Sequence, residues 1–205
     1  MGRVHTAAEY WDSVYASKQA EELSWTQADP ALSLALIREV CPSGRVIDIG
    51  GGTSPLAARL LENGYTAAVV DISQAAIKIA RDKYGDRIEW LVADVTSMPA
   101  LGEYTLWHDR AVFHFLVDAG DRAAYVALLK RTVPAGGHAV IATFALDGPE
   151  KCSGLPVRRY DGPALQVELG PEFRLMKCVP ETHATPWGKP QSFQYSVFER
   201  VPARP

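Results

Sequence analysis

A glycine-rich turn near residue 50 constrains the fold of this chain more than any other feature. The run Val46–Ser54, VIDIGGGTS, is typical of a buried strand that ends in three glycines, Gly50, Gly51 and Gly52, before an apolar helix. Glycines at such a turn let the backbone approach a ligand closely, because no Cβ intervenes. The start of the following helix adds unpaired N–H groups. The run therefore predicts an α/β sheet that binds a nucleotide-like ligand at this turn.

The rest of the chain extends this pattern. Nearly continuous apolar strands are predicted over residues 45–49, 67–71, 87–93, 104–108 and 138–144, with helices over 31–40, 74–83 and 121–132 and one more after the glycines. Asp29 is expected to cap the helix at 31–40, with Pro30 in its first turn. Strands that alternate with helices in this way predict a parallel sheet covered on both faces.

The C-terminal part breaks the alternation. Residues 172–180 and 192–201 read as two strands with no helix between them, joined by a long loop that contains Trp187, so they should pair antiparallel. The predicted fold is α/β and Rossmann-like: a seven-stranded, mostly parallel sheet with an antiparallel C-terminal strand pair and helices on both faces.

The length of the chain predicts a single domain, and its charge indicates which partners it does not suit. The 205 residues are expected to divide into an N-terminal helical lid (1–43), a ligand-binding core (44–145) and a substrate-side segment (146–205). A net charge of −3 does not suit a nucleic-acid partner, and no apolar run is long enough to cross a membrane. The sequence start lacks the apolar core of a signal peptide. Three cysteines without a CxxC pair predict a reduced, cytoplasmic protein with no metal site. Either a monomer or a homodimer is expected.

Four residues near the strand ends narrow the ligand. Pro55 stands where a dinucleotide fingerprint needs its third glycine, so pyrophosphate binding is not expected. Asp48 would repel a pyrophosphate but suits the amino group of a methionine moiety, or a sulfonium. Asp71, about twenty residues beyond the glycines, can accept hydrogen bonds from both ribose hydroxyls. Asp94 can accept one from the adenine amino group, with apolar neighbours beside the ring. Together these residues predict S-adenosylmethionine.

The sequence resembles the class I S-adenosylmethionine-dependent methyltransferases over nearly its whole length. DIGGG at 48–52 resembles their first motif, Asp71 their ribose-binding acid, and ADV at 93–95 their adenine motif. The phrases LWHDRAVFHF (106–115) and CSGLPVRRY (152–160) are similar to a bacterial subgroup related to thiopurine- and tellurite-type enzymes and to small protein-lysine methyltransferases. The resemblance implies S-adenosylmethionine as methyl donor and S-adenosylhomocysteine as product.

The resemblance also implies that N-terminal aromatic residues cover the donor. Trp11, Tyr15 and Trp25 would then face the sulfonium through cation–π contacts, or Trp11 and Tyr15 would only dock their helix. The cofactor-binding residues expected from all these observations are Trp11, Tyr15, Trp25, Asp48, Gly50, Gly51, Gly52, Asp71, Ile72, Ala93, Asp94, Val95 and His108.

Catalytic candidates lie at the end of the fourth predicted strand. His108 is read either as a general base or as a hydrogen-bonded structural histidine, and Asp109 as a second catalytic candidate. Asp109 and Arg110 are expected to form an ion pair with each other; the alternative is that Arg110 binds an acidic substrate.

Three further residues are candidate substrate contacts. His114 follows in an aromatic segment, where packing or lining the cofactor is the favoured role. Cys152 lies in a loop after the fifth strand, where it would touch a soft acceptor or a metalloid, or would simply be buried. His183 is placed in the long terminal loop, either closing over the acceptor or exposed.

The leading functional hypothesis is in-line methyl transfer to an S, N or O nucleophile of a small molecule. The alternatives are a protein-lysine methyltransferase and a non-catalytic cofactor-binding module. A nicotinamide oxidoreductase is disfavoured by Pro55 and by the antiparallel tail.

Overall fold

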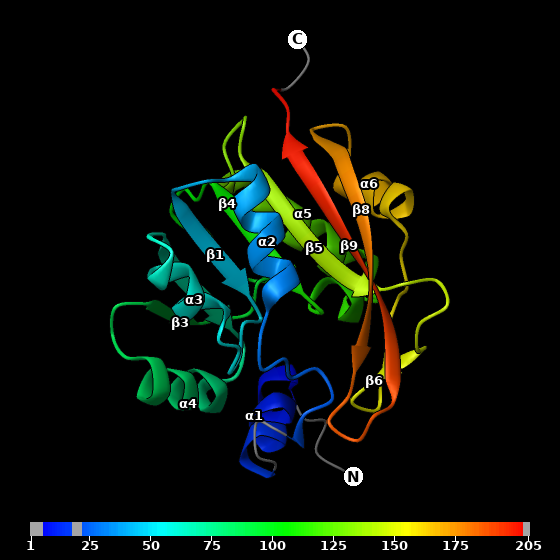
Figure 1. The fold of residues 1–205 in the computed structure, drawn as a ribbon. Coiled ribbons are helices and arrows are strands. Elements are labelled where there is room, and N and C mark those ends of the chain that lie inside the picture. The colour runs from blue at the N-terminus through cyan, green and yellow to red at the C-terminus, as the bar shows by residue number, and fades with distance from the viewer. Residues whose placement is uncertain (1–5, 18–21, 203–205) are drawn as a thin grey trace.

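The computed structural model describes residues 6–17 and 22–202. Its centre is a seven-stranded sheet with the order β3-β2-β1-β4-β5-β9-β8 (Figure 1). The strands are β1 (Arg45–Ile49), β2 (Thr66–Asp71), β3 (Glu89–Val92), β4 (Leu106–Arg110), β5 (His138–Phe144), β8 (Phe173–Ala184) and β9 (Pro190–Arg200). A separate two-stranded hairpin is formed by β6 (Lys151–Cys152) and β7 (Leu155–Pro156).

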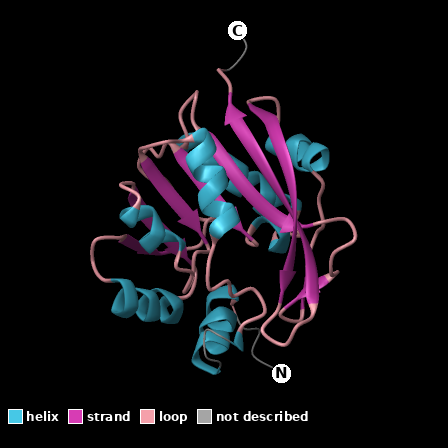
Figure 2. Cartoon of the chain, viewed as in Figure 1, coloured by secondary structure: helices cyan, strands magenta, loops and turns pink. Residues whose placement is uncertain are grey.

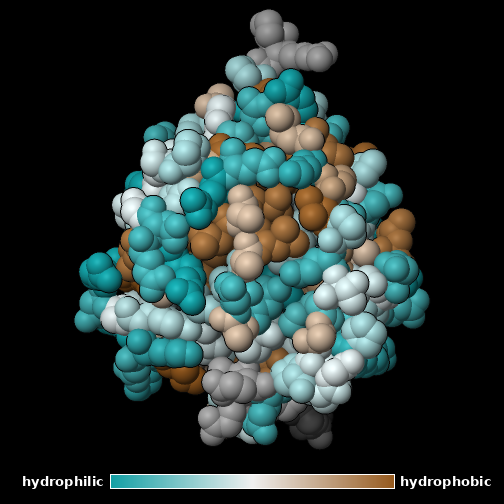
Figure 3. All heavy atoms as spheres, viewed as in Figure 1, coloured by the Kyte–Doolittle hydropathy of each residue, from teal (hydrophilic) through white to brown (hydrophobic). Residues whose placement is uncertain are grey.

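Helices cover both faces of this sheet (Figure 2). The helical elements are α1 (Ala7–Ser17), α2 (Ala31–Val40), α3 (Leu56–Glu62), α4 (Gln74–Tyr84), the 3-10 turn η2 (Phe113–Phe115), α5 (Ala119–Thr132) and α6 (Gly162–Leu169). Figure 1 shows α2 and α3 in front of the sheet and α5 behind it. In the space-filling view of the same face, apolar side chains gather around α2 and polar residues surround them (Figure 3).

The strand directions confirm the predicted fold. Strands β3, β2, β1, β4 and β5 run parallel, whereas β9 pairs antiparallel with both β5 and β8. Two apolar clusters lie on the two faces of the sheet: one packs against α2 and α3, the other against α5 and α6. Strands β1, β2, β4 and β5 are almost wholly buried, as expected for a sheet covered on both sides, whereas the edge strand β3 is partly exposed.

Two local predictions were wrong. Asp29 does not cap α2: Pro30 occupies the N-cap position and no side chain bonds the first turn. The terminal strands are longer than predicted, because the pairing of β8 with β9 continues through His183 opposite Gln191 to Ala184 opposite Pro190. Only residues 185–189 remain as the connecting loop, and a proline as the first residue of β9 is compatible with a strand.

Among the described residues, no helix is long and apolar enough to cross a membrane. Helix α1 lies at the carboxyl ends of the parallel strands (Figure 1), and Gly50, Asp71 and Asp94 follow or end three of these strands.

Candidate active site

The glycine turn after β1 brings the backbone against its neighbours. The Gly50 N–H donates to the Val70 carbonyl across 2.6 Å, and Gly50 has a φ of +63°. A Cβ on Gly50 would collide with Val112, and one on Gly52, at a φ of +50°, would collide with the Tyr15 hydroxyl. The turn therefore needs glycine for its conformation and for its close packing.

Asp71 ends β2 beside this turn. Its Oδ1 accepts a hydrogen bond of 2.8 Å from the Ser73 N–H, and the carboxyl group is buried. Burial raises its pKa to about 6, against the opposing effect of backbone hydrogen bonds from Ser73 and Gly52. Tyr15 lies next to it, and its phenol pKa is also raised, by burial and by the Asp71 charge.

Asp94 follows β3 with its side chain fixed locally. Its Oδ1 accepts from the Thr96 N–H at 2.8 Å and from the Thr96 hydroxyl at 2.7 Å. Ala93 and Val95 flank it and pack against the apolar cluster beneath. The Asp94 carboxylate is therefore held by a local turn between two apolar residues, and its role in binding adenine stays a prediction.

Aromatic side chains gather over these strand ends. The Trp11 ring lies edge-on to Trp25 at 5.6 Å between centroids and to Phe115 at 5.2 Å. Tyr15 contacts Trp25 in the same way at 6.2 Å. These four residues come from α1, the segment before α2, and η2, and together they form an aromatic cover.

Helix α1 is attached at both ends of this cover. Asp12 accepts hydrogen bonds from the Ser73 hydroxyl at 2.7 Å and from the Ala75 N–H at 3.0 Å, which ties α1 to the start of α4. On the other side the Tyr10 hydroxyl donates to the Ser153 carbonyl in the β6–β7 hairpin. Helix α1 therefore connects the start of α4 with the β6–β7 hairpin.

Two cavities lie beneath the cover. The large cavity has a volume of about 380 Å³, and its walls include eleven residues that the sequence singled out: Trp11, Tyr15, Trp25, Gly50, Asp71, Ile72, Ala93, Asp94, Val95, Arg110 and Cys152. The small cavity, of about 50 Å³, is lined by Asp48, Gly51, His108 and Ser33, among others. Trp25, Gly50 and Arg110 line both cavities, so the two cavities lie next to each other at these residues, a boundary that we call the passage.

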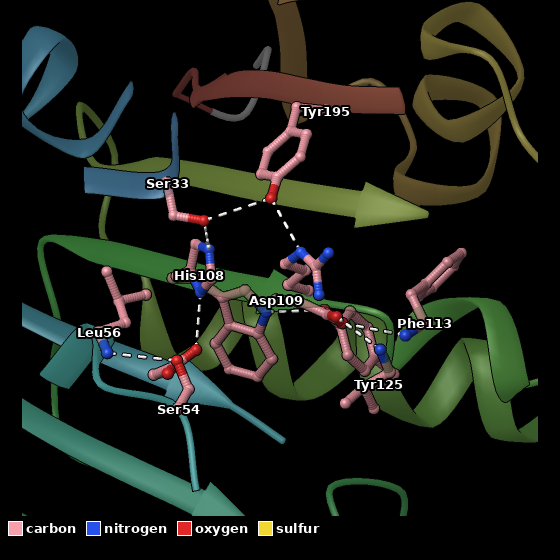
Figure 4. Close-up of polar contacts among 12 residues, drawn as sticks. Ser33, Ser54, Leu56, His108, Asp109, Phe113, Tyr125 and Tyr195 are labelled. Carbon is pink, nitrogen blue, oxygen red and sulfur yellow. Dashed lines mark hydrogen bonds and ion pairs between the residues drawn. The ribbon is translucent and has the colours of Figure 1, made fainter. Parts of the chain in front are cut away.

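His108 belongs to a buried polar chain under the small cavity (Figure 4). Its Nδ1 lies 2.6 Å from Asp48 Oδ1 and its Nε2 lies 2.9 Å from the Ser33 hydroxyl. Ser33 in turn lies 3.5 Å from the Tyr195 hydroxyl, which accepts from Arg110 Nε at 3.0 Å. His108 therefore joins the first strand to α2, which agrees with its reading as a hydrogen-bonded structural histidine.

The predicted ion pair between Asp109 and Arg110 is wrong. Successive residues of a strand point to opposite faces, so Asp109 and Arg110 of β4 are directed apart. Asp109 Oδ2 accepts from the Tyr125 hydroxyl at 2.6 Å and from the Phe113 N–H at 3.0 Å, and Oδ1 accepts from Val112 N–H at 2.8 Å (Figure 4). Burial raises the pKa of Asp109 to about 6. The structure thus places Asp109 outside both cavities, where it anchors the turn that leads into η2.

Two of the candidate histidines also lie outside the cavities. The Phe144 N–H donates to Nδ1 of fully buried His114, whose pKa is lowered to about 3 by burial and by the Arg110 charge. His183 is not in a loop, as the sequence predicted, but buried in β8, where its Nε2 donates to the Ser24 carbonyl at 2.8 Å. Its ring therefore holds the segment before α2 rather than facing solvent.

Cys152 does line the large cavity, from β6 of the small hairpin. Its side chain is buried, and burial raises the pKa of the thiol to about 11, although the Arg110 charge acts in the opposite direction. The thiol is therefore protonated near neutral pH. No group of three or more metal-ligating side chains occurs within residues 6–17 and 22–202.

Sequence reasoning missed several residues of the site. Asp12 and Tyr10 attach α1, while Ser33, Tyr195 and Glu181 extend the polar chain. Only Asp12 carried a signal, because it is a carboxylate between Trp11 and Tyr15 of an aromatic helical pattern. The others become neighbours through contacts between residues far apart in the chain.

Comparison with known proteins finds similarity to methyltransferases. Residues 46–137 match the family model of a methyltransferase domain. The chain is 28% identical over 96 residues to the eEF1A lysine and N-terminal methyltransferase of Mus musculus, an alignment that covers 45% of this chain and 14% of that protein. The chain thus spans only a small part of that relative's length.

Solved structures are similar over nearly the whole chain. One, concerned with the conversion of a disulfide bond into a thioacetal group during echinomycin biosynthesis, has a TM-score of 0.78 at 20% identity and covers 96% of this chain and 93% of its own. Another is the Burkholderia thailandensis 1,6-didemethyltoxoflavin-N1-methyltransferase with bound 1,6-didemethyltoxoflavin and S-adenosylhomocysteine. Its TM-score is 0.68 at 16% identity, and the match covers 96% of this chain and 84% of that one. At these identities the likeness concerns the fold.

Proposed function

Because this chain belongs to the class I S-adenosylmethionine-dependent methyltransferases, we propose that it transfers the donor's methyl group to an S, N or O nucleophile of a small molecule. The observation that carries the proposal is the large cavity of about 380 Å³, which is lined by α1, by the predicted donor-binding residues and by further apolar residues.

The donor is assigned to both cavities. Its adenosine part fits the large cavity, with Asp71 accepting from the ribose hydroxyls and Asp94 beside the adenine. Its amino-acid part fits the small cavity, where Asp48 supplies a negative charge opposite the ammonium group. The sulfonium lies between these parts in the donor molecule, so it falls at the passage beside Gly50 and Trp25.

The remaining walls of the large cavity are suited to a small acceptor. They are largely apolar and include Phe115, Leu155 and Pro156 together with the Cys152 thiol. A volume of about 380 Å³ lies near the lower end of the range of roughly 300–1,000 Å³ that is usual for ligand pockets. Once the donor is bound, only a compact acceptor has room beneath α1.

Methyl transfer requires few chemical groups from the protein. The bound donor supplies an activated methyl group on its sulfonium, and the chain's residues have to orient the acceptor in line and exclude water. No histidine among the described residues lines the large cavity. We therefore expect an acceptor atom that offers a lone pair without an imidazole base, such as a thiolate, a phenolate or a neutral amine.

A donor-dependent screen tests this proposal. Purified protein with S-adenosylmethionine labelled in its methyl group is incubated with small thiols, phenols, amines and metalloid oxyanions, and product is detected by mass spectrometry. Asp71→Asn is the matched control, since it should reduce every activity through donor binding. Methylation of purified proteins, without methylation of any small molecule, would contradict the proposal.

The second candidate is methylation of a protein lysine. It is favoured by the match to the eEF1A lysine and N-terminal methyltransferase, which covers 45% of this chain. It requires α1 to move away from the large cavity, because a lysine carried by a folded protein has to enter this cavity from outside. Release of α1 by Tyr10→Phe should raise activity on a protein acceptor and lower it on a small molecule.

A further inference from the structure

The passage between the two cavities carries a charge that does not suit the donor. Arg110 is one of the three residues that line both cavities, and its side chain is 10% exposed. A guanidinium is always charged in proteins, and it repels a sulfonium at short range. A site that binds the charged donor at this passage therefore needs a compensating charge.

Arg110 is held firmly at this place. Its Nη1 donates to the Trp25 carbonyl at 2.9 Å, its Nε donates to the Tyr195 hydroxyl at 3.0 Å, and its guanidinium lies 4.4 Å from the centre of the Phe193 ring. The first contact also fixes the backbone of Trp25, which lines both cavities. These packing and hydrogen-bond contacts therefore keep Arg110 at the passage, and they place its positive charge there.

Glu181 supplies the opposite charge. It projects from β8, and its Oε2 lies 3.7 Å from Arg110 Nη2, while its Oε1 accepts from Gln27 Nε2 at 3.1 Å. The Glu181 side chain is 18% exposed, so solvent screens the pair only partly. Neither Glu181 Oε2 nor Arg110 Nη2 makes a hydrogen bond within the described residues, so the two interact through charge.

We propose that Glu181 neutralises Arg110 at the passage and thereby allows the site to accept the positively charged donor, S-adenosylmethionine, rather than favouring its uncharged product. This inference rests on the proposed function, because it uses the donor position given above. Arg110 is the positioning residue for Trp25 in this scheme, and Glu181 determines how strongly the site discriminates between sulfonium and thioether.

The test compares two ligands that differ only by the methyl group and its charge. Dissociation constants of S-adenosylmethionine and S-adenosylhomocysteine are measured by calorimetry, and their ratio is taken for each variant. Damage to the fold weakens both ligands alike and leaves the ratio unchanged. Glu181→Gln keeps an oxygen for Gln27 but removes the charge, so it should weaken S-adenosylmethionine roughly tenfold relative to S-adenosylhomocysteine.

Two further variants test the direction in which the ratio of dissociation constants shifts. Arg110→Gln removes the positive charge that lines both cavities and leaves Glu181 without its arginine, so the ratio should shift the opposite way, toward the charged donor. Glu168→Gln is the matched control, since Glu168 also pairs with arginines, but its partners Arg122 and Arg158 line neither cavity, unlike Arg110. Its ratio should equal that of the wild type.

The outcomes separate this inference from the proposed function. An unchanged ratio in Glu181→Gln, or equal shifts of the same sign in Glu181→Gln and Arg110→Gln, would overturn the charge-balance proposal. If the wild type binds neither ligand, the donor assignment fails instead. High salt should reduce the effect of Glu181→Gln, because the pair is partly exposed.

Discussion

Replacing Tyr125 by phenylalanine tests whether Asp109 is an anchor of the fold. The Tyr125 hydroxyl donates to Asp109 Oδ2 at 2.6 Å and accepts from Trp107 Nε1 at 2.7 Å, and all three side chains are fully buried. The variant loses a hydrogen bond to a buried carboxylate, worth roughly 1.5–3 kcal/mol, and leaves an indole N–H unpaired at a cost of roughly 1–3 kcal/mol. We expect a loss of about 3–5 kcal/mol in the free energy of unfolding at pH 8.

The loss should depend on pH in a defined direction. Burial raises the pKa of Asp109 to about 6 in the folded protein, above its ordinary value of 3.8, so the folded state binds the proton more tightly. The contribution of such a group to stability is fully present below about pH 4 and is lost as the pH rises through about 6. Without the Tyr125 hydrogen bond this pKa rises further. The deficit of Tyr125→Phe should therefore be smaller at pH 5 than at pH 8.

Urea unfolding at both pH values measures the deficit. The wild type and a Tyr160→Phe variant serve as references, since Tyr160 is also a buried tyrosine, but its hydroxyl only approaches Glu168 at 3.4 Å. A deficit below about 1 kcal/mol at pH 8, or one of equal size at both pH values, would refute the anchoring role. Binding of S-adenosylhomocysteine should change little, because Asp109 lines neither cavity.

Three other predictions follow from the site. Asp71 has a pKa of about 6, and only its ionised form accepts from both ribose hydroxyls, so affinity for S-adenosylhomocysteine should fall below about pH 6; a titration series that stays flat from pH 5 to 8 would contradict this. Cys152, with a pKa of about 11, should react with iodoacetamide at pH 7.5 far more slowly than exposed Cys178, as peptide mass spectrometry would show; equal labelling would count against the buried thiol. Asp12→Ala should release α1 at a cost of roughly 1–2 kcal/mol and speed proteolysis at its ends, whereas Asp12→Asn, which keeps an acceptor oxygen, should lose less.

Local patterns were sufficient to predict the fold. The glycine turn, the apolar strands and the missing helix before residue 192 predicted a mostly parallel sheet with an antiparallel end, and the strand order confirms it. They succeed because a buried parallel strand has to be apolar throughout, and because a tight turn at a positive φ requires glycine. The same logic brought Asp71 and Asp94 to one edge of the sheet, where both line the large cavity.

Roles that depend on partners from distant segments could not be predicted from the sequence. Asp109 and Arg110 are adjacent in the chain, and only the pleat of β4 shows that they face opposite sides, one toward Tyr125 and the other toward Glu181. His183 lies in a stretch with turn-forming residues, yet pairing with β9 extends the strand through it.

The sequence by itself therefore determined the fold and the donor, because both follow from residues close together in the chain. Tertiary structure decided which charges meet at the passage, since Arg110, Trp25 and Glu181 come from β4, the segment before α2 and the terminal hairpin. The distance between a guanidinium and a carboxylate follows from packing of three segments, and no local pattern encodes it.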